Sequence, residues 1–304
     1  MKKIIGLCFL LTSTLLFSEE NFNNLGEVHH KFLSNRGKEQ FRNNIVFNKF
    51  ERNGYSNSNQ FLEYLGEITR DYYGGSNYPD YDVKTKGFLM GTTSNLVSNP
   101  DVYVGVNLGY FKSNLNYDNE NSKVRTYGID YYLGKEYYKN WLVIGKIGYS
   151  ENKNIYTDYK YRTKNYSLEI ENGYFLSLGE KSILYSYVSL DWNQYTIKSH
   201  NNIETTDNKI GSSSLGLTYT LEFYNKFLLM ANGEWLYEFD NKNEIRSIDN
   251  KKFEKIKTDK NTGIFNIKLG YFIKPEFLIS LGYSSFINKN YYYDMFSLTL
   301  SHNF

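Results

Sequence analysis

Short and long connections alternate between the segments of this chain that carry a strand-like pattern. The predicted strands cover residues 41–55, 81–97, 101–116, 122–138, 139–157, 164–178, 181–199, 210–224, 226–240, 261–273, 276–288 and 291–304. The short connections lie at 98–101, 139–140, 179–181, 225–226 and 274–275. The longer ones lie at 116–122, 152–164, 199–209 and 241–260, and the last, near 288–290, is shorter than the alternation predicts. Tight turns at one end and long loops at the other are typical of a transmembrane β-barrel.

Apolar and polar side chains alternate within several of these segments. In 164–178 the apolar set runs from Tyr166 through Leu168 and Ile170, while Glu169 and Glu171 have the opposite parity. Successive side chains on a strand point to opposite faces. Buried carboxylates would be costly in a dry soluble core, but they meet water on the inner wall of a wide barrel. The pattern therefore favours a barrel with a lipid-facing outside over a soluble sandwich.

The composition agrees with this fold class. The chain has 31 Tyr and 21 Phe but 3 Pro, and all three prolines fall in predicted connections. Its mean hydropathy is −0.57, and after the N-terminus it contains no apolar run of the roughly 18 residues that a spanning helix requires. We predict an all-β chain forming a single transmembrane antiparallel β-barrel of about twelve strands, with a short N-terminal helix in the lumen as an option.

The N-terminus has the features of a secretory signal peptide. Two lysines follow Met1, an apolar stretch comes next, and cleavage is expected after Ser18. Cys8, the only cysteine, lies inside this segment, so disulfides and thiol chemistry are not expected in the mature chain. We therefore divide the chain into a signal peptide (1–18), a short N-terminal segment that is either a pore helix or a tail (19–40), and the barrel (41–304).

The last predicted strand ends the sequence on an aromatic residue. Its apolar parity consists of Phe296, Leu298, Leu300, His302 and Phe304, opposite small polar residues. This stretch resembles the C-terminal assembly signal of bacterial outer-membrane barrels. His302 departs from that pattern, because an aromatic residue is usual at its position. The resemblance implies that the outer-membrane barrel assembly machinery and outer-membrane lipid are partners.

Three stretches near the start of the barrel carry a second resemblance. They read YDVKTKGFLMG at 81–91, VGVNLGY at 104–110 and YGIDYY at 127–132. Their order and spacing resemble the autotransporter β-domain family over roughly residues 41–304. The resemblance implies a twelve-stranded outer-membrane barrel with a helix in its pore, which helps to export an N-terminal passenger. Residues 19–40 leave no room for a passenger, which is a departure from the family.

The expected function follows from that resemblance. We predict an autotransporter-like translocator barrel without an obvious passenger, in the bacterial outer membrane with both termini periplasmic. The alternative is a small outer-membrane pore, or a surface adhesin that acts through its extracellular loops on an unknown host or cell-surface ligand. The loop at 241–260, which carries Ile245, Ile248 and Phe253, is the largest candidate surface for such a ligand.

No catalytic, cofactor or metal site is expected. The histidines are His29, His30, His200 and His302, and none has the neighbours of a catalytic triad or of a metal site. No phosphate-binding glycine loop is present, and a net charge of +2 gives no reason to expect a nucleic-acid partner. The chain is therefore not expected to be an enzyme.

Acidic residues on the inward parity suggest what the lumen contains. They are Asp130, Glu169, Glu171, Asp191, Glu222, Glu234 and Glu238. One interpretation is ordinary lumen polarity. The other is an acidic wall that either selects cations or docks a basic plug, for which the candidates are His29, His30, Lys31, Arg36 and Lys38.

Overall fold

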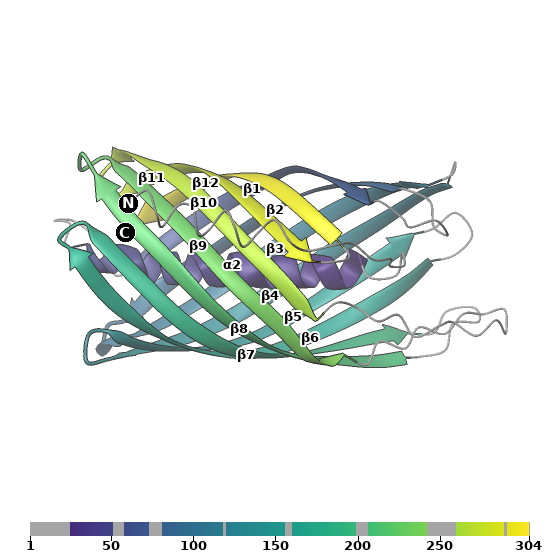
Figure 1. Cartoon of the computed structure of the whole chain (residues 1–304), viewed down its shortest axis with the longest axis horizontal. Coiled ribbons are helices and arrows are strands. Elements are labelled where there is room, and N and C mark those ends of the chain that lie inside the picture. Colours follow the sequence, from purple (N-terminus) through teal and green to yellow (C-terminus); the bar gives the residue numbers. More distant parts are fainter. Residues whose placement is uncertain are drawn as a thin grey trace.

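The chain forms a closed antiparallel β-barrel with one helix inside it (Figure 1), as a computed structural model shows. The structure describes residues 25–50, 58–72, 81–117, 120–155, 160–198, 206–241, 260–288 and 291–303. The predicted signal peptide at 1–18, His200, Phe304 and nearly all of the loop at 241–260 lie outside the described residues. No helix among the described ranges has the length and apolarity needed to cross a membrane.

Twelve strands make up the barrel, as predicted. They are β1 (Ser58–Tyr72), β2 (Tyr81–Leu96), β3 (Asn99–Tyr117), β4 (Glu120–Tyr137), β5 (Trp141–Ile155), β6 (Lys160–Gly179), β7 (Ser182–Lys198), β8 (Thr206–Phe223), β9 (Phe227–Asn241), β10 (Asn261–Lys274), β11 (Phe277–Asn288) and β12 (Tyr291–Asn303). Each strand pairs with its neighbour in sequence. Pairing of β1 with β12, over Asn59–Leu65 and Ser297–Asn303, closes the sheet.

The two ends of the barrel differ, and we name them accordingly. The short-turn end carries the tight connections at 97–98, 138–140, 180–181, 224–226 and 275–276. Two of these turns place consecutive non-glycine residues at positive φ, namely Tyr138 with Lys139 and Tyr224 with Asn225. Two successive left-handed residues match the twist of a two-residue hairpin. The loop end is the opposite end, and β1 begins and β12 finishes at the short-turn end (Figure 1).

The predicted strand at 41–55 is wrong, and with it the boundary of the barrel at residue 41. Residues 41–49 belong to helix α2 (Leu25–Lys49), and the first strand is instead β1, which was not predicted. In α2, polar and apolar side chains are buried on every side, so no apolar stripe marks the helix. In β1, Phe61 and Leu65 face the lumen while Leu62 and Tyr64 face outward, so its alternation is hidden.

The remaining strands have the two faces that alternation implies. On β6 and β12, Leu168, Ile170 and Phe296 are exposed on the outside of the barrel. Their sequence neighbours, among them Glu169, Glu171 and Ser297, are buried toward the lumen. The buried interior of this protein is therefore the lumen itself, filled by α2 and by inward side chains. Its apolar part forms two clusters, one around Phe41 and Ile45 and one around Leu33.

Candidate functional site: the helix in the lumen

Helix α2 passes through the lumen from the loop end to the short-turn end (Figure 1). Near its start, the His29 ring hydrogen-bonds with Ser113 Oγ at 2.6 Å and with Thr126 Oγ1 at 2.8 Å. At its last residue, the Lys49 ammonium donates to the Glu136 carboxylate and, at 2.8 Å, to the Lys139 carbonyl in a tight turn. The helix therefore occupies the pore along its length.

One face of α2 packs against glycines of β3 and β4. A Cβ placed on Gly109 would overlap Leu33 Cδ1, and one on Gly128 would lie 2.8 Å from the same atom. Gly109 and Gly128 are direct cross-strand partners, so together they form one notch for the Leu33 side chain. A side chain at either position would force the Leu33 side chain out of this notch.

The same arrangement recurs along the helix. Two turns further on, Phe41 lies over Gly105 and Gly134, where added Cβ atoms would be 2.7 Å and 3.2 Å from its ring. Between the two notches the helix contributes a glycine of its own, since a Cβ on Gly37 would lie 2.6 Å from Tyr132 Oη. Leu33, Gly37 and Phe41 are spaced four residues apart, which places them on one helical face. Glycines on the helix and on β3 and β4 thus allow the helix and the barrel wall to approach closely along this face.

The opposite side of α2 is held by buried ions, and the first cluster is centred on Arg36. Its guanidinium donates to Glu63 on β1, to Glu39 Oε2 at 2.6 Å and to Ser284 Oγ at 3.0 Å. Lys268 on β10 lies 3.7 Å from both carboxylates. Arg36 is 1 % exposed and Glu63 is fully buried, so each charge depends on these partners for its stabilisation.

A second cluster surrounds Lys38 on the β6 and β9 side. The Lys38 Nζ atom lies 2.5 Å from Glu169 and 3.7 Å from both Glu171 and Glu234. One turn along the helix, Arg42 donates to Glu171 at 3.2 Å.

Side chains of the wall complete this cluster. The Arg42 guanidinium lies 4.1 Å from the centre of the Tyr187 ring, and the Tyr187 hydroxyl donates to Glu234 Oε2 at 2.6 Å. Lys146 on β5 donates to Glu169 at 2.7 Å. Three carboxylates of the barrel wall thus surround two cations of the helix, and all five side chains are buried.

The structure brings together some of the predicted site residues and not others. Glu169, Glu171 and Glu234 meet the helix cations, and Asp191 lies 4.0 Å from Lys146. Asp130 instead accepts a hydrogen bond from Tyr132 at 3.4 Å. Glu222 and Glu238 are buried on the inward face.

The predicted plug residues make two kinds of contact with the barrel wall. Arg36 and Lys38 are in ion pairs, whereas His29 and His30 hydrogen-bond with hydroxyl groups, His30 with Ser150 Oγ at 2.8 Å. Lys31 lies on α2, and its side chain is outside the described part.

Sequence reasoning missed Glu63 and Lys268 as members of these clusters. Glu63 was missed because its strand was not predicted. The inward parity of Lys268 was visible in the sequence and could have identified it. Among the described residues no group of acids and histidines is arranged to hold a metal ion.

The predicted assembly signal lies on the outside of β12. Phe296 is 66 % exposed and Leu298 is also exposed, while Leu300 and His302 are half-buried on the same face. The His302 ring lies 6.1 Å from the ring of Phe277 on the neighbouring strand. His302 therefore occupies an aromatic position in the outer surface, as its parity implied.

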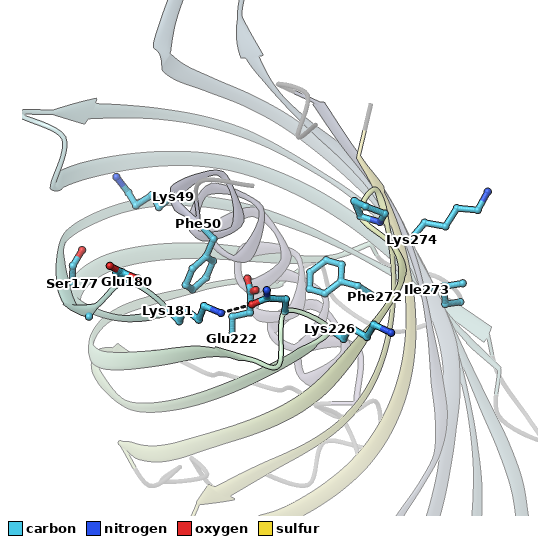
Figure 2. Close-up of a pocket in the computed structure, with 13 residues that line it drawn as sticks. Lys49, Phe50, Ser177, Glu180, Lys181, Glu222, Lys226, Phe272, Ile273 and Lys274 are labelled. Carbon is cyan, nitrogen blue, oxygen red and sulfur yellow. Dashed lines mark hydrogen bonds between the residues drawn. The ribbon is translucent and has the colours of Figure 1, made fainter. Parts of the chain in front are cut away.

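Beside the end of α2, the short-turn mouth of the barrel is hollow. A cavity of about 880 Å³ lies between the helix end and the turns of β6 to β11 (Figure 2). Lys49 and Phe50 line it on the helix side, and Lys181, Glu222 and Lys226 line it on the wall side. Since α2 packs against β3 and β4, the unfilled space is left on the opposite wall.

Comparison with known proteins gives one family and a group of similar folds. The profile of the autotransporter β-domain family matches residues 62–284. The translocator domain of autotransporter NalP from Neisseria meningitidis superposes with a TM-score of 0.63 at 10 % identity, covering 93 % of this chain and 100 % of that one. The β domain of the Bordetella autotransporter Brka gives 0.58 at 13 % identity, with 82 % and 100 % covered.

A third similar structure is the transport unit of autotransporter AIDA-I from Escherichia coli. Its TM-score is 0.54 at 11 % identity, covering 84 % of this chain and 92 % of that one. At these identities the structural likeness establishes the fold alone. Curated protein sequences give no match.

Proposed function

The chain belongs to the autotransporter β-domain family of outer-membrane translocator barrels, and from this premise we propose that α2 is the seal of its pore. The observation that carries the proposal is the pair of buried ion clusters between helix and wall. Breaking a buried ion pair by removing one partner costs about 3–5 kcal/mol. A helix held by several such pairs is docked, and does not merely rest in the lumen.

The proposed orientation places both ends of the barrel sheet in the periplasm. Support comes from the short turns, because outer-membrane barrels have short periplasmic turns and longer extracellular loops. The start of β1 and the finish of β12 lie at the short-turn end. The first turn of α2 then lies at the cell surface, which is the arrangement required if a segment before the helix has been exported through this pore.

Further parts of the proposal concern partners and chemistry. The outward Phe296, Leu298 and Leu300 support insertion by the outer-membrane barrel assembly machinery, with outer-membrane lipid as the surrounding partner. Transport or secretion, with no enzymatic reaction, is the activity proposed for the barrel. Residues 1–18 are proposed to be its signal peptide.

Conductance in planar bilayers tests the seal. The variant R36E/K38E/R42E turns attraction into repulsion in both clusters, and we expect steady open-channel current where the unaltered barrel is closed. The control K135E/K139E/K209E reverses the same number of charges on exposed side chains that line neither the lumen nor the mouth cavity, and this variant should stay closed. A triple variant that is folded yet as silent as the control would contradict the proposal.

A small constitutive pore is the second candidate, and the cavity at the short-turn mouth favours it. That candidate requires current from the unaltered protein, so the same recording separates the two functions. The adhesin alternative rests on the loop at 241–260 and stays a prediction.

A further inference from the structure

Five cationic side chains form one row across the outside of β2 to β6. The register pairs Lys86 with Lys112, Lys112 with Arg125, Arg125 with Lys153, and Lys153 with Arg162. We call these five residues the basic belt. Side chains directly opposite on neighbouring strands have Cβ atoms about 5 Å apart, and like charges in such positions are destabilising. A row of this kind needs anions from elsewhere.

The belt points away from the lumen. Lys86, Lys153 and Arg162 are exposed, while Lys112 and Arg125 are half-buried by their neighbours. The residues next to them in sequence, such as Thr85, Ser113 and Thr126, are buried on the lumen side. The lumen carboxylates therefore cannot neutralise the belt, because the wall of the barrel separates the two sets.

Among the described side chains, few acids lie on the same outward face as the belt. Four more cations flank the belt on the same outward face, namely Lys84, Lys123, Lys160 and Lys164. Among the outward side chains described at this height of β2 to β6, Glu151 is the one acid, and Arg162 donates to it at 2.9 Å.

Arg125, at the middle of the belt, carries a further sign of a missing partner. Its Nε atom is shielded from solvent and has no hydrogen-bond partner among the described residues. A half-buried guanidinium with an unused donor is suited to a planar or multi-oxygen anion.

A row of aromatic rings fixes the depth of the belt in the membrane. Two to four positions nearer the short-turn end, Phe88 and Tyr110 have ring centres 5.8 Å apart, and Tyr110 and Tyr127 are 5.0 Å apart. Tyr149 and Tyr166 continue the row at 5.2 Å. Aromatic girdles mark the interface between hydrocarbon and headgroups. The belt, just beyond that girdle, lies at the level of the lipid headgroups.

Among the described side chains, the other half of the barrel has no equivalent row, although the register also places Lys198 of β7 opposite Arg162. On β7 to β12, Lys209 is the one cation among the outward side chains described near the loop end. Asp294 on β12 is also there, and it accepts a hydrogen bond from Tyr283. Among the described outward side chains, positive charge is thus concentrated on one side of the barrel, which a uniform requirement for solubility does not explain.

We propose that the basic belt binds the phosphate groups of a phosphorylated glycolipid in the leaflet at the loop end. Arg and Lys are the residues that recognise phosphate oxygens, and a lipid with more than one phosphate can bridge several strands. The acyl chains of that lipid would lie against exposed apolar residues below the girdle, such as Leu108, Leu133 and Ile147. Its assignment to the outer leaflet rests on the orientation proposed above.

Binding of defined lipids to the purified full chain in zwitterionic detergent tests this site. The probes are lipid A with two phosphates, the same lipid with its phosphates removed, and inorganic phosphate. We expect the bisphosphorylated lipid to bind at least tenfold more tightly than the dephosphorylated one. Each cation near a membrane surface contributes to anionic-lipid binding, so K86Q/K112Q/R125Q/K153Q should weaken binding about 100-fold or more.

The control K135Q/K139Q/K226Q/K274Q removes four positive charges at the short-turn end and should bind within about twofold of the unaltered protein. If the fourfold belt variant does not fold, K112Q/R125Q, with about a tenfold loss expected, gives the same test.

Three results would overturn the inference: unchanged affinity of a folded belt variant, equal binding of the dephosphorylated lipid, or full competition by millimolar inorganic phosphate. None depends on α2, so a leaking pore with intact lipid binding would reject only the proposed seal. A closed pore without lipid binding would reject only the belt.

Discussion

Replacing Lys38 by methionine isolates the contribution of one buried charge to the docking of α2. Methionine keeps most of the side-chain volume but removes the ammonium that lies among Glu169, Glu171 and Glu234. The barrel sheet itself is not altered. Any change should therefore appear in the equilibrium between docked and undocked helix.

The size of the effect follows from what remains around each carboxylate. Glu169 keeps Lys146, Glu171 keeps Arg42, and Glu234 keeps the Tyr187 hydroxyl. Because no carboxylate is left alone, the lower end of the range for broken buried pairs applies, about 3 kcal/mol. That value corresponds to about a 100-fold rise in the undocked fraction.

A single cysteine can report that fraction. The native Cys8 lies in the predicted signal peptide, so V46C in the mature chain supplies a unique thiol on the helix. Val46 is buried in the apolar cluster around Phe41, where a cysteine of similar size is shielded while the helix is docked. Reaction with a bulky, membrane-impermeant maleimide should follow the undocked population, and K38M should raise the rate about 100-fold. Adding E234Q to K38M removes the excess negative charge and should recover part of the loss.

Unchanged labelling of K38M within about twofold would refute the reasoning, because the buried ion pairs would then not hold the helix. A faster rate that E234Q does not reduce would show that the effect comes from packing of the methionine and not from charge.

The remaining predictions concern the notch, the last strand and the largest loop. G109L should clash with Leu33, undock α2 and open the pore in planar-bilayer recordings. G233A, with no atom within 4 Å of the added Cβ, should leave the pore closed. F296D places a charge on the outward face of β12 and should lower the yield of folded barrel in the membrane, measured by heat-modifiable migration on gels. Deleting residues 242–259 should abolish cell binding if the loop is an adhesive surface, and unchanged binding would remove it from consideration.

The barrel could be predicted because its signals are local. Alternation along β3, β6 or β10 reports the pleat directly, and tight turns such as that at Tyr138 to Asn140 separate neighbouring strands. The two errors at the start of the barrel share a cause. Helix α2 is buried on every side, and β1 has apolar side chains on its lumen face as well as on its outer face. Neither element therefore shows the alternation of polar and apolar residues that is typical of its class.

The functional surfaces were only partly visible in the sequence, because they depend on register. Acids on the inward parity of the strands and basic residues in the N-terminal segment suggested a docked basic plug, but not that Arg36 would meet Glu63. The glycines at 109 and 128 look ordinary until the pairing of β3 with β4 makes them one notch. Likewise, Lys112 and Arg125 become neighbours only across a strand pair.

The direction of α2 limits the side from which the helix can leave the lumen. Phe50 and Ser58 both lie at the short-turn end, and the seven residues between them can span at most about 29 Å when fully extended. A helix of 25 residues is about 37 Å long. Tension applied from the loop end therefore pulls the helix against its own tether before it can clear the barrel, unless β1 tears from the sheet. The helix can leave the lumen freely only at the short-turn end, where the chain connects it to β1.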